Sequence, residues 1–534
     1  MKARRLFLLL FLPVLLNAQE QEPAAAKVVE QWDYLELTLE GPETGNPYLE
    51  VDLSAVFTNG HREIEAQGFY DGEGIYKIRF MPDEPGQWRY KTWSNVWPLT
   101  AQEGDFTVTP AGEGNHGPVR VYQQYHFAYA DGTVYYPFGT TTYNWLHRPR
   151  ETQKATIETL RGSPFNKLRM LVFPEGKGSR SAPERFPFEG DPPADWDFSR
   201  FNPEYFRQIE ARLLELREIG VEADLILFHK YGSEWGFDTM PAEVDDRYLR
   251  YIVARLSAFR NVWWSMANEY DFVKTKQESD WDRYFQIVRA GDPYNHLRSI
   301  HNGFLIYDHN KPWVTHASIQ NGAAVEESGR AQMYLDVWRK PVVYDEVKYE
   351  GDNERRWGNL SGEEMTHRVW CGIVAGTYVG HGECYNQPDK VVWLSTGGRL
   401  HGTSPARIAF LKEILESGPG PINQVDKWQD TQLAGVPGEF YLKYFGHDAP
   451  LEWTFQLPRA GVRTGQVYTV DIIDTWDMTV TPVEGTFTLE RKDRYHFVDE
   501  AGRVVDLPGK PNMALRITRV GGQAGRVTEE DPNL

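Results

Sequence analysis

The stretch NVWWSMANEYD, residues 261–271, decides the fold of this 534-residue chain. It begins as an apolar run typical of a buried strand, and it ends in Asn268 and Glu269. A carboxylate at the tip of a buried strand is costly unless it is exposed, paired or used. In (β/α)8 barrels, the C-terminal ends of the strands carry the catalytic residues. The stretch PVVYDE, residues 341–346, has the same pattern and ends in Glu346. We therefore interpret Glu269 and Glu346 as a catalytic pair.

Apolar, strand-like runs alternate with helix-like segments from Tyr135 onward, which is the pattern of a parallel α/β architecture. The clearest helical segment, residues 203–220, has apolar residues at helical spacing and ends at Gly220. A doubly wound sheet is the alternative, but no GxGxxG or phosphate loop opens the first helix. Eight strand–helix units over roughly 300 residues predict a (β/α)8 TIM barrel with enlarged loops. The eight predicted strands are residues 135–145, 166–174, 221–230, 262–269, 297–302, 313–320, 341–346 and 377–383.

The segments on either side of the predicted barrel have a different hydrophobic pattern. Residues 31–108 alternate with period two and are punctuated by turn signals such as Asn59-Gly60, which predicts a β-sandwich of immunoglobulin type. Strand patterns return after Pro421 and predict a second β-sandwich. The expected fold is a multidomain α/β protein with a central TIM barrel and two flanking β-sandwiches. The predicted divisions are a signal peptide (1–18), an immunoglobulin-like β-sandwich (19–115), a (β/α)8 catalytic barrel (116–421) and a C-terminal β-sandwich (422–534).

The N-terminus has the pattern of a signal peptide. Lys2, Arg4 and Arg5 precede an apolar run over residues 6–16, and cleavage is expected before Gln19. The protein is therefore expected to be exported, to the periplasm or the exterior. No later stretch predicts a membrane span. The net charge of −19 argues against a nucleic-acid partner, because phosphate binding needs a basic surface. The oligomeric state is left open.

The chain has two cysteines, Cys371 and Cys384. Export permits a disulfide between them. Two buried thiols are the preferred interpretation, because free cysteine behaves as a small buried hydrophobe.

Polar and ionisable residues gather at the predicted C-terminal ends of all eight strands. One polar strand end means little, but eight on one face of a barrel describe a polar pocket. Aromatic residues in the loops between strands and helices, Trp145, Trp235, Phe237 and Trp393, either stack on sugar rings or only pack the loops. The predicted substrate-binding residues are Tyr143, Asn144, Trp145, Arg169, His229, Trp235, Asn268, His301, His316, Tyr344, Glu383 and Trp393.

Two carboxylates in such a pocket suit the cleavage of a glycosidic bond, where one protonates the leaving oxygen and the other attacks the anomeric carbon. The first needs a raised pKa and the second must stay ionised. We assign Glu269 as general acid/base and Glu346 as nucleophile. Arg169 is expected to keep the nucleophile charged, and Tyr344 or His316 to orient it.

Asp345 is the main rival for the role of nucleophile. Alternation places Tyr344 and Glu346 on one face of the strand and Asp345 on the other, so only one set is expected to point into the barrel. Asp271 and Glu383 have weaker claims to the pocket. The alternative for each is a capping or ion-paired carboxylate.

Several histidines raise the question of a metal site, but none has HExxH or comparable ligand spacing. We predict no metal and no cofactor. There is also no GxSxG elbow of a serine hydrolase.

Four stretches carry a resemblance to a known family. They are FNKLRMLVFP (165–174), FHKYGSEWGF (228–237), WWSMANEYD (263–271) and KPVVYDEVKYEGD (340–352). Glutamates ending strands four and seven, with an arginine on strand two, resemble the large clan of retaining (β/α)8 glycoside hydrolases. The four stretches resemble more closely the apiosidase-like bacterial glycosidases, which also have an N-terminal immunoglobulin-like domain and a C-terminal sandwich. The resemblance covers most of the chain.

The resemblance implies a retaining glycosidase that acts by double displacement on a plant, algal or microbial polysaccharide, without fixing the sugar or the linkage. The alternative is a non-catalytic glycan-binding protein on a barrel scaffold, which would have lost one of the two carboxylates. A metal-dependent hydrolase or lyase is a third hypothesis, and a chelator would inhibit it.

Overall fold

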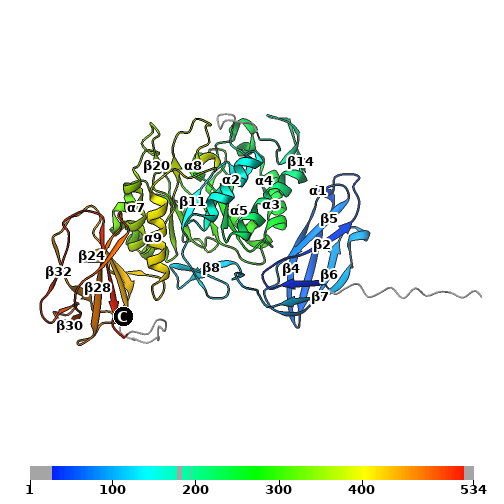
Figure 1. Ribbon diagram of the computed structural model, residues 1–534. Coiled ribbons are helices and arrows are strands. Elements are labelled where there is room, and N and C mark those ends of the chain that lie inside the picture. The colour runs from blue at the N-terminus through cyan, green and yellow to red at the C-terminus, as the bar shows by residue number, and fades with distance from the viewer. Residues whose placement is uncertain (1–26, 177–182, 194, 522–534) are drawn as a thin grey trace, which may run out of the picture.

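The computed structural model describes residues 27–176, 183–193 and 195–521. The predicted signal peptide lies outside these ranges. Figure 1 shows three parts in a row, with a central barrel between an N-terminal and a C-terminal sheet domain. No described helix is long and apolar enough to cross a membrane.

Eight short parallel strands form the barrel, one within each predicted run. Five of them pair in one sheet and three in a second. The two sheets meet on one side at a bridge between Thr140 and His381. On the other side, the amide of Thr315 donates to the carbonyl of Arg298 at 2.9 Å. The predicted TIM barrel is therefore confirmed. The strands are β11 (Gly139–Thr141), β12 (Lys167–Leu171), β15 (Glu222–Phe228), β16 (Val262–Ala267), β17 (Arg298–Ser299), β18 (Ala317–Gln320), β19 (Val342–Glu346) and β21 (Tyr378–Val379).

Helices surround the strands, and their ends follow from the sequence. The predicted 203–220 segment forms α3 (Pro203–Glu218), where the Asn202 side chain accepts from the amide of Glu204 and Gly220 takes a left-handed conformation. A loop without a helix, residues 300–316, joins β17 to β18. The other barrel helices are α2 (Arg150–Arg161), α4 (Ala242–Leu256), α5 (Glu278–Gly291), α6 (Ser328–Trp338), α7 (Gly362–Val374) and α9 (Ser404–Glu416).

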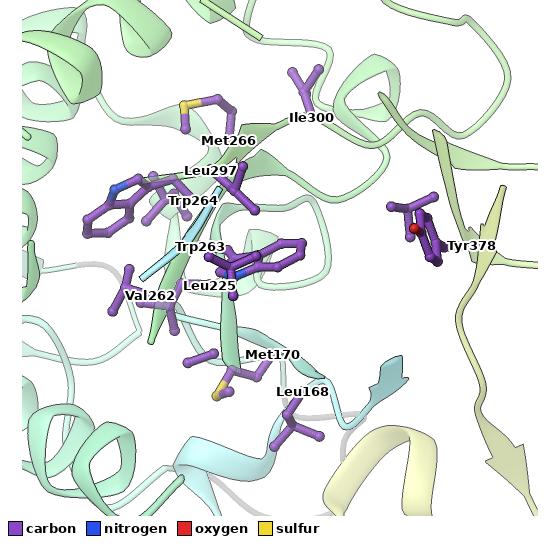
Figure 2. Packing of buried hydrophobic residues seen from close by; sticks show 14 of the residues in the cluster. Leu168, Met170, Leu225, Val262, Trp263, Trp264, Met266, Leu297, Ile300 and Tyr378 are labelled. Carbon is purple, nitrogen blue, oxygen red and sulfur yellow. The ribbon is translucent and has the colours of Figure 1, made fainter. Parts of the chain in front are cut away.

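A three-stranded meander closes the N-terminal end of the barrel. It consists of β8 (Val119–Tyr122), β9 (His126–Tyr129) and β10 (Val134–Tyr135), and β8 lies beneath the barrel in Figure 1. Phe127 of β9 packs 5.3 Å from the ring of Trp263 and 5.7 Å from that of His316. This plug leaves the opposite, C-terminal end for a site. Figure 2 shows the core around Trp263, with Leu168, Met170, Leu225, Trp264, Met266 and Leu297.

The N-terminal sheet domain buries one apolar core between seven strands. Phe57 and Phe80 stack in it with their ring centroids 4.0 Å apart. Its strands are β1 (Lys27–Glu30), β2 (Leu35–Glu40), β3 (Leu53–Asn59), β4 (Arg62–Tyr70), β5 (Ile75–Phe80), β6 (Gly86–Ser94) and β7 (Glu103–Thr109).

Buried ion pairs join this domain to α3 and α4. Glu210 of α3 forms ion pairs with Arg79 at 2.9 Å and with Arg255 of α4 at 2.6 Å. Arg255 also pairs with Asp71 at 2.8 Å. Burial raises the pKa of Glu210, but the two guanidinium groups outweigh it and hold that pKa below its ordinary value. Buried charges that are this well matched fix one docking geometry, because each becomes costly when it loses its partner.

The C-terminal sheet domain packs against α7. Tyr444 lies 5.4 Å from the ring of Trp370, and its hydroxyl meets Nδ1 of His367 at 2.9 Å. Cys371 and Cys384 are both free and buried, as predicted. The domain's strands are β23 (Asn423–Asp426), β24 (Asp430–Val436), β25 (Phe440–Tyr444), β26 (Glu452–Thr454), β27 (Gln456–Pro458), β28 (Val467–Asp474), β29 (Thr479–Pro482), β30 (Phe487–Arg491), β31 (His496–Asp499), β32 (Val504–Asp506) and β33 (Met513–Arg519).

Candidate active site

Glu269 lies just beyond the C-terminal end of β16, in a left-handed conformation with φ of 48°. Its backbone starts the turn η6 (Tyr270–Phe272), where the amide of Phe272 donates to the Glu269 carbonyl at 2.9 Å. The side chain is 7% exposed, and its Oε2 has no hydrogen-bond partner among the described residues. An uncommon backbone conformation and an unsatisfied buried oxygen are features that cluster at functional sites.

Glu346 is the last residue of β19 and is surrounded by donors. The Tyr143 hydroxyl donates to its Oε1, Arg169 Nη1 lies 3.7 Å from that oxygen, and His301 Nδ1 lies 3.9 Å away. The Tyr349 hydroxyl is 3.4 Å from that of Tyr143. The strand ends of β11, β12, β17 and β19 thus converge on one carboxylate.

A β-bulge in β19 turns two consecutive carboxylates into the barrel. Tyr344 pairs with Ile319 of β18, and Glu346 pairs with the next residue, Gln320, so Asp345 is left out of the register. The prediction that only one face of this strand points inward was wrong, because a bulge breaks the alternation. Tyr344 lies on the outer side, with its ring 6.4 Å from that of Tyr334 in α6, so it does not orient the nucleophile.

Asp345 belongs to a buried ionic layer below the site. Lys167 Nζ lies 2.9 Å from Asp345 and 2.7 Å from Asp224, and the Ser318 hydroxyl donates to Asp345 at 2.5 Å. Lys167, Arg169 and Ser318 together hold the pKa of Asp345 well below its usual range, although burial by itself would raise it. A carboxylate held this way is a structural counter-ion, and Glu346 above it is the one that reaches the pocket.

The two catalytic candidates differ in their electrostatics. Burial and the neighbouring charge of Glu346 raise the pKa of Glu269 to about 8, against smaller opposing effects of Lys230 and Arg169. Burial also raises the pKa of Glu346, and Arg169 with the hydroxyls of Tyr143 and Tyr349 opposes this rise in part, so that the pKa stays above its ordinary value. Glu269 is therefore protonated at neutral pH, while Glu346 has the donors that stabilise an anion. The charge of Glu346 contributes to the raised pKa of Glu269, so the two groups lie within electrostatic reach.

Further polar atoms around this pair have no partner among the described residues. They are Oδ1 of Asn268, Nε and Nη2 of Arg169, and both ring nitrogens of His301. All three residues are almost fully buried. Buried polar groups without partners are costly in a folded protein, and they are suited to accept or donate hydrogen bonds with sugar hydroxyls.

The structure does not bring the predicted tryptophans to the pocket. Trp145, Trp235 and Trp393 are at most 2% exposed. Their indole N–H groups donate to Gln153 in α2, to Glu175 and to Thr140 in β11. Of the two interpretations of these residues, the packing one is correct.

Other predicted residues brace the strand ends. His229 bridges two strands, with Nε2 2.9 Å from the Phe173 carbonyl and Nδ1 accepting from the amide of Tyr231. Asn144 accepts from the amide of Glu175 at 3.2 Å. His316 precedes β18 and therefore lies at the plugged end of the barrel, beside Phe127, rather than at the site.

Glu383 was a pocket candidate, and it is instead part of a buried group with Glu350 and His381, whose ligand-type atoms lie within 4.8 Å of one another. The amides of His401 and Gly402 donate to Glu383. Glu350 accepts from amides and hydroxyls at the start of α9. These carboxylates already have donors from the protein, and they hold the start of α9.

The sequence interpretation missed Tyr349 and Trp357, and it placed Lys230 at a polar strand end without giving it a role. Tyr349 lies three residues after Glu346 and contacts the same hydroxyl network. Lys230 carries the cation whose charge reaches Glu269. Trp357, 39% exposed, packs edge-on to Tyr349 at 6.1 Å. Tyr349 and Lys230 lie near strand ends, within stretches that had already been singled out, whereas Trp357 lies beyond them.

Comparisons with known proteins match three parts of the chain. The apiosidase-like catalytic domain model matches residues 122–407. Two domain families of unknown function, DUF5060 and DUF5605, match residues 28–95 and 428–518. No curated protein matches the chain.

Solved structures resemble most of the chain. The crystal structure of a "putative glycoside hydrolase" from Bacteroides vulgatus is 42% identical, with a TM-score of 0.89 over 93% of this chain and 100% of that one. A glycoside hydrolase of family 5 from the same species is 13% identical, with a TM-score of 0.58 over 77% of this chain and 96% of that one, which shows a shared fold. The chain belongs to the apiosidase-like family of glycoside hydrolases.

Proposed function

We propose that this glycoside hydrolase cleaves O-glycosidic bonds of a plant, algal or microbial polysaccharide with retention of anomeric configuration. Glu269 is the general acid/base and Glu346 is the nucleophile. The observation that carries the proposal is the contrast between the two carboxylates: Glu346 has Tyr143 and Arg169 beside it, whereas Oε2 of Glu269 has no partner.

In the first step, Glu346 attacks the anomeric carbon as the protonated Glu269 gives its proton to the leaving oxygen. Tyr143 and Arg169 stabilise the ionised form of the Glu346 carboxylate and orient it. The leaving group then departs, and a glycosyl ester remains on Glu346. In the second step, Glu269 takes a proton from water as the water attacks the anomeric carbon, and Glu346 is released.

Asn268 and His301 supply the hydrogen bonds that position the sugar. Both lie beside the pair and have unpartnered polar atoms among the described residues. Hydrogen bonds to sugar hydroxyls that strengthen in the transition state contribute several kcal/mol in glycosidases.

We further propose that the protein acts outside the cytoplasm. The charged and apolar pattern of residues 1–18 supports export, with cleavage before Gln19. The mass of the mature N-terminal peptide from secreting cells tests this step.

The test is product release from plant, algal and bacterial polysaccharides, with the wild type, Glu346→Gln and Glu269→Gln run side by side. Release by the wild type alone, with NMR showing the anomer of the substrate in the first product formed, supports the mechanism. Azide should rescue Glu346→Ala and give a glycosyl azide of inverted configuration. An inverted first product in water, or full activity of Glu346→Gln, would exclude the mechanism. Retention of a glycan without turnover would instead identify a binding protein.

A further inference from the structure

Three consecutive apolar side chains are exposed in the loop between β17 and β18. Phe304 is 82% exposed, Leu305 66% and Ile306 45%. We call residues 304–306 the apolar strip. A single exposed apolar residue is ordinary, but a contiguous patch marks a place where something binds.

The strip is fixed to the turn that follows Glu269. Asp271 accepts hydrogen bonds from the amides of Gly303 at 2.6 Å, Phe304 at 2.8 Å and Leu305 at 3.0 Å. Asp271 therefore caps the backbone of this loop, which is the alternative to a pocket role that the sequence analysis gave for it. These three bonds use its oxygens and hold the loop in one conformation.

Ring packing ties the strip to the acid side of the site. The Phe304 ring meets that of Phe272, in η6, at 5.2 Å and nearly edge-on. Gly303 allows this approach, since a Cβ there would lie 2.5 Å from the Phe272 ring. Lys230 Nζ lies 4.2 Å from the centre of the same ring, and its charge reaches Glu269. The strip therefore contacts Phe272, Phe272 contacts Lys230, and Glu269 lies three residues before Phe272 at the start of the same turn.

This placement selects one side of the bond that is cleaved. In a retaining glycosidase the nucleophile faces the anomeric carbon of the retained sugar, and the general acid faces the leaving oxygen. A platform beside Glu269 therefore meets the leaving group. On the Glu346 side a different aromatic residue is exposed, Trp357, which packs on Tyr349.

On the basis of the proposed function, we propose that the apolar strip is a leaving-group subsite on which the next sugar ring of a polysaccharide stacks through its C–H face, with Phe304 as the main contact. The leaving group is therefore a sugar unit of the polysaccharide and not a small aglycone.

The openness of the strip favours a sugar over an aromatic aglycone. Apolar C–H groups of a pyranose ring pack on an aromatic face, while its equatorial hydroxyls need water or polar partners. A ring that lies on a side chain as exposed as Phe304 keeps those hydroxyls in solvent. An aromatic aglycone would gain most from an enclosed apolar pocket, and the strip does not enclose its ligand.

Two substrates with the same retained sugar test the inference. One is the oligosaccharide that the wild type cleaves, and the other is the glycosyl fluoride of the sugar that it retains, which has no leaving-group ring. We expect Phe304→Ala to lower kcat/KM on the oligosaccharide by about tenfold and to change it less than about twofold on the fluoride. Phe304→Tyr keeps the ring and should behave as wild type.

Trp428→Ala is the matched control, because Trp428 is 87% exposed and lies in the turn between β23 and β24. It should change neither substrate. Equal losses on both substrates for Phe304→Ala, or no loss on either, would overturn the subsite while leaving the hydrolase intact. A wild type that releases no product from any of the plant, algal and bacterial polysaccharides would overturn the subsite together with the proposed function.

Discussion

Exchanging two adjacent carboxylates, one at a time, separates catalysis from structure in β19. Glu346→Gln and Asp345→Asn each remove one negative charge at almost constant volume. We expect Glu346→Gln to lose turnover by about a thousandfold or more without losing stability. Asp345→Asn should lose stability and keep its turnover per folded molecule within about tenfold of wild type.

The surroundings of Asp345 give the magnitude of the stability loss. Its carboxylate pairs with Lys167 at 2.9 Å in a layer that is almost fully buried. Breaking a buried pair costs about 3–5 kcal/mol. Lys167 keeps its second partner, Asp224, at 2.7 Å, so we expect the lower end of that range, about 3 kcal/mol.

The sign of each effect follows from the pKa shifts. The folded protein holds the pKa of Asp345 below its unfolded value, so its ionised form contributes stability at neutral pH that is lost as the pH falls through the folded pKa. The pKa of Glu346 is raised in the folded protein, so its ionised form costs stability at neutral pH. Glu346→Gln should therefore be slightly more stable than wild type at pH 7, with the difference disappearing below the unfolded pKa.

Thermal unfolding and kcat, measured on the same preparations of both variants, check the pair. An unchanged Tm for Asp345→Asn would refute the buried-pair argument. A Glu346→Gln protein that retains turnover, beside a folded Asp345→Asn protein that has none, would move the nucleophile to Asp345.

Three further predictions concern the charges and contacts around the site. The alkaline limb of kcat/KM should lie near pH 8, because Glu269 must be protonated and its pKa is raised to about 8. Lys230→Met should move that limb to higher pH, and a pH–rate series with both proteins measures the shift. Lys167→Met leaves two buried carboxylates without their shared cation. It should lower the free energy of unfolding by about 3–5 kcal/mol at pH 8, but by less at pH 5, where protonation of a carboxylate removes part of the repulsion. Denaturant titrations at the two pH values measure the difference. Gly303→Ala pushes a methyl group against Phe272 and should lower both Tm and kcat/KM on the oligosaccharide, whereas an unchanged Tm would contradict the packing argument.

The barrel could be predicted because each strand is a short apolar run that ends in polar residues. Its eight strands all lie within the predicted runs, and burial on both faces makes such runs visible in a single sequence. The proposed catalytic pair could be chosen for the same reason, since Glu269 and Glu346 stand at the ends of the two clearest runs.

The failures concern side-chain direction and strand ends. The bulge at Asp345 depends on how β19 pairs with β18. The sequence of β19 alone does not tell which residues of β18 it pairs with. His316 was assigned to the wrong end of the barrel because β18 begins one residue after it. Trp145 and Trp393 lie in the predicted loops, but nothing in a sequence pattern tells whether a loop tryptophan faces inward or outward.

The ion pairs between the N-terminal domain and the barrel also have a consequence for biosynthesis. Asp71 precedes Arg255 by 184 residues in the chain. At a translation rate of 5–20 residues per second, Asp71 is therefore synthesised roughly 10–40 s before Arg255. During that interval the N-terminal domain is free to fold as a unit, with Arg79 already paired to Glu36 within it at 2.8 Å. When α3 and α4 emerge, Glu210 and Arg255 meet a preformed, charged surface. The first half of the barrel thus has a template to assemble on before the strands that close it have been synthesised.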